Sequence, residues 1–300
     1  MNTLSSTFLC FWLLWSIFAL APAQETRPAE STPVEEMSVV SWNIRVGVGP
    51  DRNWKGEDAP KNLQAIAEAI QKWEADIVLL QEVDRGSART KGIDQLAILG
   101  EATGMHTAWA PAIEEETMLY GIGILSRWPI EESHAIKLPK VDYSDRDVPA
   151  WYSEQRMALV ARVDAGGVPL SVVDTHMGLT KEQRLAQLKA VAEIVEREME
   201  SGRAVIAGGD LNAEPDAAEL LPLRALLRDA YHDHVNEQGL AADIPIAERL
   251  TYPAVEPDRS IDYLFVSDAH FDVEEVEVPA VPLSDHLPVV AKLRVKQENP

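Results

Sequence analysis

Cysteine is almost absent from this sequence. The 300 residues include a single cysteine, Cys10, which lies in an apolar block near the N-terminus. If that block is removed, the mature chain has no cysteine, so its stability must come from the core that a chain of this length can bury and not from disulfide bonds. The residues before Cys10 do not resemble a lipoprotein cleavage site, so we expect no lipid attachment there.

Basic residues are scarce as well. Lys and Arg number 27 against 49 Asp and Glu, which gives a net charge of −22, and residues 1–23 contribute no charged side chain to it. A charge of this sign and size opposes tight non-specific binding to nucleic acid, because such binding depends on Lys and Arg that neutralise phosphates. It does not oppose the binding of a metal ion.

An apolar block spans residues 4–20 and is followed by Ala21-Pro22-Ala23 and a polar, proline-rich segment. Its length and the A-x-A site are typical of a secretory signal peptide, although no Lys or Arg precedes the block. The alternative is an uncleaved N-terminal anchor. We predict a signal peptide at 1–23 with cleavage near Ala23, a linker at 24–36, one domain at 37–296, and export to the periplasm or the extracellular space.

Strand-like and helix-like segments alternate along the rest of the chain. Several strand pairs are hairpin-like, which favours an α/β fold with mixed sheets covered by helices over a purely parallel sheet. A capping box at Thr180 and Gln183 predicts the start of a helix that runs to about Glu200. The other predicted helices cover 60–73, about 95–102 and 216–227, and the predicted strands cover 37–42, 76–80, 121–125, 157–163, 170–174, 203–207, 261–266 and 287–293.

Polar side chains stand where these apolar strands end or are interrupted. Loops at strand ends are where a rigid scaffold presents chemistry. The set contains acids, amides and two imidazoles but no Cys or Ser nucleophile. Its members are Asn43, Glu82, His176, Asp210, Asn212, Asp262, Asp285 and His286.

The segment AGGDLNAEP, residues 207–215, places Asp210 and Asn212 on a turn loosened by glycine after an apolar run. Residues at i and i+2 of an extended chain face the same side, so both side chains can address one ligand. The alternative is that they fold back onto backbone amides of their own turn.

Glu82 follows the apolar run 77–80, where an unpaired carboxylate is costly unless a cation or a donor meets it. A metal ion would satisfy it, and so would an ion pair with Arg85 or Arg89. Asn43 has a similar alternative as a turn residue before the nearby glycines.

In SDHLP, residues 284–288, Asp285 and His286 share a site only if the chain turns there. The alternative is a Ser-Asp turn with His286 in solvent. Asp262 lies within an apolar strand and needs a partner, and a histidine is an obvious one.

Six segments, taken in order, resemble the endonuclease/exonuclease/phosphatase superfamily of metal-dependent phosphoesterases. The resemblance spans residues 38 to about 295 and implies a four-layered α/β/β/α sandwich with the site at one end of two central sheets. The segments are WNIR (42–45), LLQEVD (79–84), DTHM (174–177), GGDLNAEP (208–215), SIDYLFVS (260–267) and SDHLPV (284–289).

The resemblance also implies a metal region. Glu82 matches the family's principal Mg²⁺ ligand, with Asn43 beside it and Asp285 contributing. Mn²⁺ is an alternative ion. Carboxylate and amide oxygens suit hard cations of this kind.

The remaining matched positions imply catalytic roles. Asp210 matches the residue that orients or deprotonates the attacking water, and Asn212 and His176 match groups that bind the phosphate. His286 matches an imidazole that is held charged by Asp262. In-line attack on a phosphodiester needs an oriented water, donors for the developing charge and a cation near the leaving oxygen.

We therefore expect a secreted Mg²⁺-dependent phosphodiesterase or phosphatase whose phosphoester substrate is small or lipid-linked. A lipid head group is a candidate partner, the acidic charge disfavours nucleic acid, and the sequence sets no oligomeric state. The alternatives are a secreted nuclease that acts on DNA or RNA and a non-catalytic binding module with the same fold.

Two further features are interpreted as structural. His232-Asp233-His234 has the His-x-His spacing of zinc sites, but no further ligand follows at suitable spacing, so we predict a polar loop. Arg156 precedes a predicted strand and could reach a phosphate, but we predict a surface ion pair for it.

Overall fold

The computed structural model describes residues 34–50, 58–143, 145–237 and 249–296. The predicted signal peptide and the first part of the predicted linker lie outside these residues. Within the described part of the chain, no helix is both long enough and apolar enough to cross a membrane. All of the predicted site residues are described.

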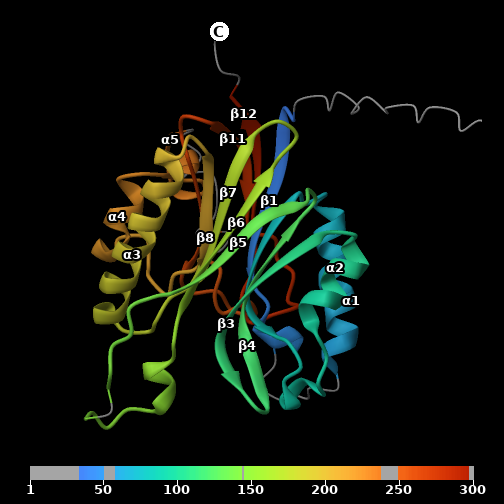
Figure 1. The fold of residues 1–300 in the computed structure, drawn as a ribbon, viewed down its shortest axis with the longest axis vertical. Helices are drawn as coiled ribbons and strands as arrows, with labels where there is room; N and C mark the ends of the chain where they lie inside the picture. Colours follow the sequence, from blue (N-terminus) through green and yellow to red (C-terminus); the bar gives the residue numbers. More distant parts are fainter. Residues whose placement is uncertain (1–33, 51–57, 144, 238–248, 297–300) are drawn as a thin grey trace, which may run out of the picture. The chain divides into compact units, whose positions relative to one another are not determined.

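The first of two sheets contains six strands in the order β11-β12-β1-β2-β4-β3. Its centre pairs β1 (Glu36–Asn43) in parallel with β2 (Ile77–Asp84). Helices α1 (Ala59–Lys72) and α2 (Gln95–Thr103) pack against its outer face (Figure 1). The other strands are β3 (His106–Glu115), β4 (Met118–Ser126), β11 (Phe271–Glu277) and β12 (Val289–Val295).

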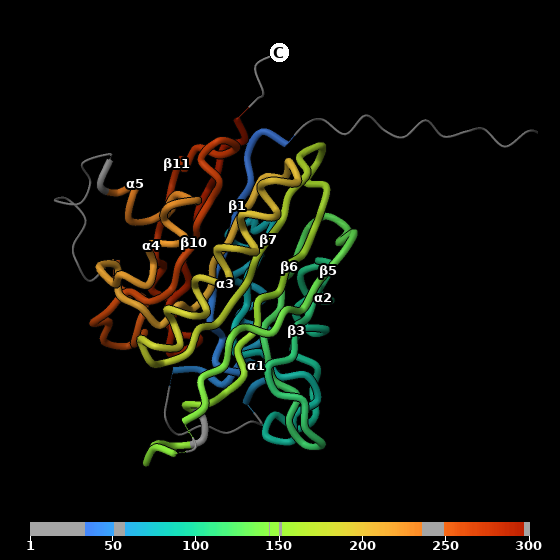
Figure 2. Tube along the Cα trace, turned by 60° about the vertical axis from the view of Figure 1, so that its left-hand side comes forward, coloured from blue at the N-terminus to red at the C-terminus, as the bar shows by residue number. Residues whose placement is uncertain are grey.

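The second sheet also has six strands, in the order β5-β6-β7-β8-β10-β9. Helices α3 (Lys181–Glu200) and α4 (Leu221–Arg224) pack on its outer face (Figure 2). Its strands are β5 (Ile130–Lys137), β6 (Met157–Asp164), β7 (Pro169–His176), β8 (Ala204–Asp210), β9 (Arg228–Asp229) and β10 (Asp262–Val266). Short helical turns complete the chain at η1 (Arg45–Gly47), η3 (Ala88–Thr90), η4 (Ala150–Ser153), η5 (Ala218–Leu220) and α5 (His232–Glu237).

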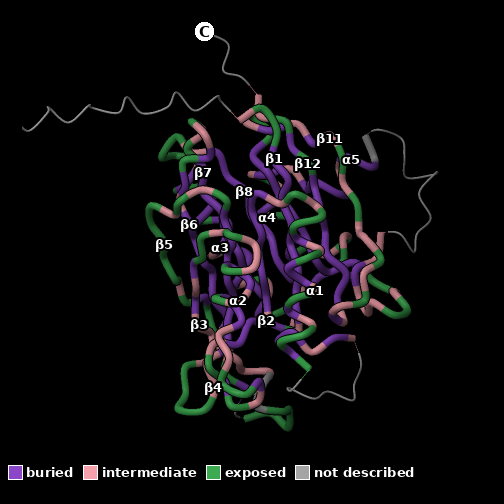
Figure 3. Tube along the Cα trace, turned by 90° about the vertical axis from the view of Figure 1, so that its right-hand side faces the viewer, coloured by how far each residue is buried: buried purple, intermediate pink, exposed green. Residues whose placement is uncertain are grey.

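Alternation along the strands explains the layers. Successive side chains point to opposite faces, so each strand that is apolar on both faces is covered on both. The inner faces form one apolar core between the sheets, with Leu79 of β2 and Val172 of β7 fully buried in it. The outer faces meet the helices, and the buried segments run through the middle of the domain (Figure 3). This confirms the predicted four-layered α/β/β/α sandwich.

The predicted capping box is present at the start of α3. Thr180 Oγ1 accepts a hydrogen bond from Gln183 N at 3.3 Å, and Gln183 Oε1 accepts one from Thr180 N at 3.2 Å. Two backbone donors that have no partner within the helix are thereby satisfied. The cap fixes where α3 begins, a few residues after β7 ends.

Two predictions about elements were wrong. The helix predicted at 216–227 is instead a 3-10 turn over 218–220 followed by the short α4 over 221–224, with Pro222 in the first turn of α4, where its missing N–H is not needed. Strands β3, β5, β9 and β11 were not predicted. Each of these four strands lies at the edge of its sheet, and β5 exposes most of its side chains.

Candidate active site

The polar strand ends meet at one end of the two sheets. His176 ends β7 and Asp210 ends β8, and these residues are register partners in the parallel pairing. Asp262 begins β10 and is the antiparallel partner of Asp210. Asn43 ends β1 of the other sheet, and Glu82 lies near the end of β2. Both sheets therefore contribute side chains to the same site.

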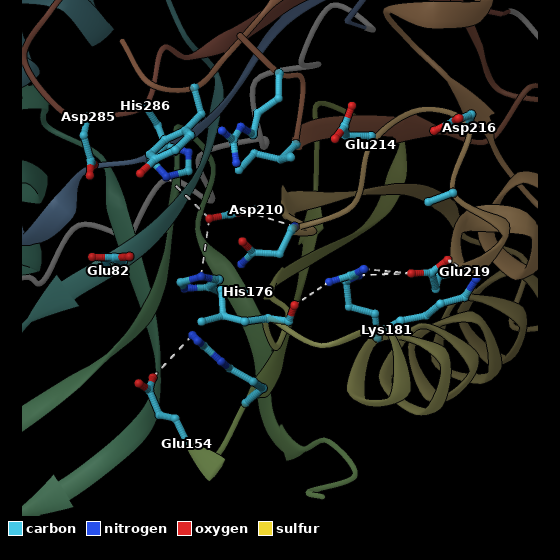
Figure 4. Close-up of a pocket in the computed structure, with 18 of the residues that line it drawn as sticks. Glu82, Glu154, His176, Lys181, Asp210, Glu214, Asp216, Glu219, Asp285 and His286 are labelled. Atoms are coloured by element: carbon cyan, nitrogen blue, oxygen red, sulfur yellow. Dashed lines mark hydrogen bonds and ion pairs between the residues drawn. The ribbon is translucent and has the colours of Figure 1, made fainter. Parts of the chain in front are cut away.

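The carboxylate of Asp210 makes both of the contacts that the sequence left as alternatives. Its Oδ1 accepts a hydrogen bond from Asn212 N at 3.0 Å, as a turn-forming aspartate would. Its Oδ2 accepts one from Asn43 Nδ2 at 3.1 Å. The same oxygen lies 3.3 Å from His176 Nε2 and 3.7 Å from His286 Nε2 (Figure 4). One oxygen stabilises the turn and the other belongs to the site.

The glycines before Asp210 do not form the turn that was predicted. Gly208 and Gly209 lie within β8, which runs on to Asp210. A Cβ on Gly209 would lie 1.8 Å from Thr175 O, and the φ of Gly209 is +128°. Glycine is therefore required because β7 approaches β8 closely at this position.

His286 is held by Asp262, as the apolar surroundings of Asp262 predicted. His286 Nδ1 lies 2.9 Å from Asp262 Oδ2, and both residues are buried. The indole of Trp42 donates a hydrogen bond to His286 O at 3.0 Å, and the ring of Tyr252 lies 4.7 Å from the imidazole. Burial alone would lower the pKa of His286, but the nearby carboxylates of Asp262 and Asp210 raise it to about 10. The imidazole is charged at neutral pH.

Burial shifts the pKa values of Asp210 and His176 in opposite directions, because it disfavours the charged form of each group. It raises the pKa of Asp210 to about 7, while the charge of His286 opposes that rise. Burial lowers the pKa of His176 well below its usual value, and the positive charges of Arg156 and His286 lower it further. Asp210 is thus poised to exchange a proton near neutral pH, next to a neutral imidazole and a charged one.

Neither of the two arginines that the sequence offered as partners forms an ion pair with Glu82, so that alternative is wrong. Arg85 Nη2 pairs with Asp94 Oδ2 at 2.7 Å, and Arg89 Nη2 pairs with Asp84 Oδ1 at 2.8 Å. Glu82 has a φ of +54° at an irregularity in the pairing of β2 with β4. A left-handed conformation is costly for a residue with a Cβ, and such conformations cluster at functional sites.

Asn43 and Asp285 lie on the Glu82 side of the site. Asn43 is fully buried, and its Nδ2 donates to Glu82 Oε1 at 3.2 Å. The turn alternative is met as well, because Asn43 Oδ1 accepts a hydrogen bond from Arg45 N at 3.0 Å. Asn43 therefore stabilises its own turn through its oxygen and contacts the site through its nitrogen. Asp285 lines the same cleft and pairs with Arg45, with 3.3 Å between Asp285 Oδ2 and Arg45 Nε. The chain does turn at Asp285, since His286 also faces the cleft.

Asn212 follows the turn with a φ of +49° and lines the cleft. Its Nδ2 donates to Met177 O at 3.1 Å. An amide nitrogen carries two hydrogens, so one remains for a ligand.

A cleft of about 980 Å³ extends from these residues. Figure 4 shows Glu82 and Asp285 on one side of Asp210, and Lys181, Glu214, Asp216 and Glu219 on the other. Most of this wall could not be predicted from the sequence, because most of its residues stand in polar segments that follow no predicted strand end. The lining residues that were not predicted are Tyr120, Glu154, Lys181, Arg184, Glu214, Asp216, Glu219, Tyr252 and Arg259.

Arg156 contradicts its sequence-based interpretation. It does form an ion pair, with 3.3 Å between its Nη1 and Glu154 Oε1, but it is only 7% exposed and lines the cleft. It lies at the site because β6 begins at the next residue, on the same end of the sheet as His176. The signal that could have identified it is an arginine directly before an apolar strand.

The His-x-His segment is not the predicted polar loop. His232 begins α5, and His234 is buried. Among the described residues, a group whose ligand atoms all lie within 4.8 Å of one another consists of Asp210, Asp262 and His286. A charged His286 offers no lone pair to an ion, so the oxygen-rich Glu82 side is the better place for one.

A poised carboxylate beside a charged imidazole, with oxygen ligands for a cation across the cleft, suits ester hydrolysis in which negative charge develops on a phosphoryl group. The class indicated is a metal-assisted phosphoester hydrolase.

The sequence profile of the Endonuclease/Exonuclease/phosphatase family matches residues 40–286, and the chain belongs to this family. Enzymes of this family are hydrolytic phosphoesterases that use divalent metal ions. 

An inositol phosphosphingolipids phospholipase C from Schizosaccharomyces pombe is 24% identical over 182 residues, which are 57% of this chain and 41% of that protein. The match therefore spans less than half the length of that relative. An endonuclease/exonuclease/phosphatase from Beutenbergia cavernae is 24% identical, with a TM-score of 0.65 over 87% of this chain and 72% of that one. A mannosyl-6-phosphatase from Bacteroides thetaiotaomicron is 19% identical, with a TM-score of 0.65 over 87% of this chain and 100% of that one.

Proposed function

We propose that the protein is an exported, Mg²⁺-dependent hydrolase that cleaves a phosphodiester by in-line attack of water activated by Asp210. The observation that carries this proposal is the position of Asp210 Oδ2, which lies 3.3 Å from His176 Nε2 and 3.7 Å from His286 Nε2. The pKa of about 7 suits a general base at neutral pH. Export rests on the signal-peptide pattern of residues 1–23.

Glu82, Asn43 and Asp285 would hold the metal ion. They fit it because they offer carboxylate and amide oxygens, and because none of the described Lys or Arg residues forms an ion pair with Glu82. Mg²⁺ supplies positive charge at the phosphoryl and leaving oxygens when it is bound. Mn²⁺ has similar ligand preferences and is an alternative.

The other side chains divide the remaining tasks. Asp210 takes the proton of the attacking water, and Asn212 and the neutral His176 bind phosphoryl oxygens. His286, kept charged by Asp262, stabilises the negative charge that develops during attack. We add Arg156 to the phosphate-binding set because its guanidinium is a buried cation that faces the cleft.

The cleft wall supports a small or lipid-linked substrate. Glu214 and Asp216 are exposed carboxylates that line the cleft, and the whole chain carries a net charge of −22. A polyanionic nucleic acid would meet repulsion there, whereas a single phosphodiester would be held by the metal region and Arg156. The phospholipase C relative, which is named for a lipid-linked phosphodiester, adds support. A nuclease activity is the alternative.

A substrate panel tests the proposal. The purified protein with Mg²⁺ should hydrolyse bis-p-nitrophenyl phosphate and a phospholipid or inositol-linked diester faster than DNA or RNA. EDTA should abolish the activity. Preferential cleavage of DNA or RNA would replace the proposed substrate class with the nuclease alternative. Absence of hydrolysis of every ester would favour a non-catalytic binding module.

A further inference from the structure

A polar layer lies between the apolar core and the active site. On the inner faces of three strands, the apolar side chains give way to Ser41 of β1, Gln81 of β2 and Asp174 of β7, which we call the inter-sheet polar layer. All three residues are fully buried at 0% exposure. Two residues further along, β1 ends at Asn43 and β7 ends at His176. The layer is therefore the floor of the site.

One hydrogen bond of this layer connects the two sheets. Gln81 Nε2, from the first sheet, donates to Asp174 Oδ1, from the second sheet, at 2.7 Å. The layer is otherwise poorly satisfied. Ser41 Oγ, Gln81 Oε1 and Asp174 Oδ2 are buried without a hydrogen-bond partner among the described residues.

Stability does not explain this arrangement. Burial raises the pKa of Asp174 well above its usual value, because burial disfavours the charged carboxylate, and no described Lys or Arg pairs with it. A buried polar atom without a partner costs free energy, and replacing both members of a buried polar pair by apolar groups of similar shape is often neutral or stabilising. The rest of the core between the sheets is apolar.

The hydrogen bond between Gln81 and Asp174 adds a directional contact between the two sheets. Apolar contacts between two sheets are non-directional, whereas a short hydrogen bond has a preferred length and angle and so constrains the relative position of its donor and acceptor. A second hydrogen bond, from Asn43 Nδ2 to Asp210 Oδ2 at 3.1 Å, also crosses between the sheets, but it joins two residues to which the proposed function already assigns roles. Gln81 and Asp174 do not line the cleft.

We propose that the Gln81–Asp174 hydrogen bond is a positioning element that fixes the metal-binding side of the site, on the first sheet, relative to the water-activating side, on the second. Gln81 directly precedes Glu82, and Asp174 precedes His176 by two residues on the same face of β7. The inference rests on the proposed function, because only a reaction that uses both sides requires this alignment. Misplacement by about 1 Å can lower a rate on the order of a hundredfold.

The test compares four variants of the full protein. Asp174→Asn keeps the volume and the acceptor, whereas Asp174→Leu and Gln81→Met remove the hydrogen bond with apolar groups of similar size. Val172→Ala is the matched control, since Val172 is fully buried two residues before Asp174 on the same face, one layer further from the site. Each variant is measured for kcat and KM on bis-p-nitrophenyl phosphate, for its thermal unfolding midpoint, and for its affinity for Mn²⁺ and for inorganic phosphate by calorimetry.

We expect Asp174→Leu and Gln81→Met to lower kcat about tenfold to a hundredfold. They should weaken phosphate binding, which uses both sheets, and change Mn²⁺ affinity, which uses the first sheet, by less than about threefold. Combining the two should cause no further loss, because both remove the same bond. Asp174→Asn should stay within about threefold of the parent, and Val172→Ala should lower the unfolding midpoint without lowering kcat.

Near-normal kcat and phosphate affinity in Asp174→Leu and Gln81→Met would overturn the proposal, and so would an equal loss in Asp174→Asn. Failure of both apolar variants to fold would overturn it too, since the pair would then be a folding element. If the parent hydrolyses no phosphoester, the proposed function fails, and the Mn²⁺ and phosphate affinities of the variants still decide whether the hydrogen bond aligns the two sides.

Discussion

The substitution Asp210→Asn separates the two roles of this carboxylate. Asn keeps the volume and can still accept the hydrogen bond from Asn212 N that Asp210 Oδ1 accepts at 3.0 Å. It then places an N–H donor where Oδ2 now accepts a hydrogen bond from Asn43 Nδ2 at 3.1 Å. The turn survives, and the group that would take a proton from water is gone.

The magnitude follows from the chemistry that is lost. A positioned general base contributes about a hundredfold to ten-thousandfold in rate, which corresponds to about 3 to 5 kcal/mol in the activation free energy. The loss should appear in kcat and not in KM, because the base acts mainly in the transition state. The new contact between two buried donors should cost about 1 to 3 kcal/mol in the free energy of unfolding, offset in part by removal of a buried charge.

The assay is hydrolysis of bis-p-nitrophenyl phosphate with saturating Mg²⁺, with circular dichroism to confirm folding. Asp229→Asn is the matched control. Asp229 is also buried with a raised pKa, and its Oδ1 accepts hydrogen bonds from Tyr231 N at 3.2 Å and His232 N at 3.0 Å, but it does not line the cleft. The control should retain kcat within about twofold. A kcat for Asp210→Asn within a few-fold of the parent would exclude Asp210 as the general base and would leave stabilisation of its own turn as its only role.

Three other predictions concern the remaining groups. Glu82→Gln should shift the Mg²⁺ titration of activity to higher concentrations while Arg85→Gln does not, and an unchanged curve would remove Glu82 from the metal region. Asp262→Asn should move the alkaline limb of the pH–rate profile to lower pH. Asp262 helps raise the pKa of His286 to about 10, so without its charge the imidazole loses its proton at a lower pH. An unmoved alkaline limb would mean that the interaction of Asp262 with His286 does not affect the rate. Arg156→Gln should lower kcat/KM about tenfold or more. The control Arg127→Gln removes the ion pair between the exposed Arg127 and Asp76 and should have little effect. An equal kcat/KM for the two variants would mean that Arg156 has a structural role only.

The sequence predicts the strand ends well because an apolar run that stops at a polar residue is a local signal. His176 and Asp210 are identified in this way, whereas Asp262 is identified because a carboxylate among apolar neighbours needs a partner. The register that makes all three meet is not local. It depends on β8 lying between β7 and β10, and neither a local pattern nor the resemblance to a known family predicted that strand order.

Other features escaped prediction for physical reasons. An ion pair was predicted for Arg156 without a named partner, but its burial with Glu154 depends on the start of β6 lying beside the cleft, which no local pattern indicates. The edge strand β5 was missed because its exposed side chains hide the alternation that marks a half-buried strand. The hydrogen bond between Gln81 and Asp174 joins residues 93 positions apart, and no local pattern indicates it.

The proposed function requires that metal-assisted attack on a phosphoester takes place between Glu82 and Asp210. It is tested most directly by the rate at which the purified protein releases p-nitrophenol from bis-p-nitrophenyl phosphate, measured with Mg²⁺, with EDTA, and with Mg²⁺ restored in excess. We expect hydrolysis with Mg²⁺, loss of activity with EDTA, recovery when Mg²⁺ is restored, and a rate for Asp210→Asn at least about a hundredfold below the parent. Hydrolysis that persists in EDTA, or that survives in Asp210→Asn, would contradict it.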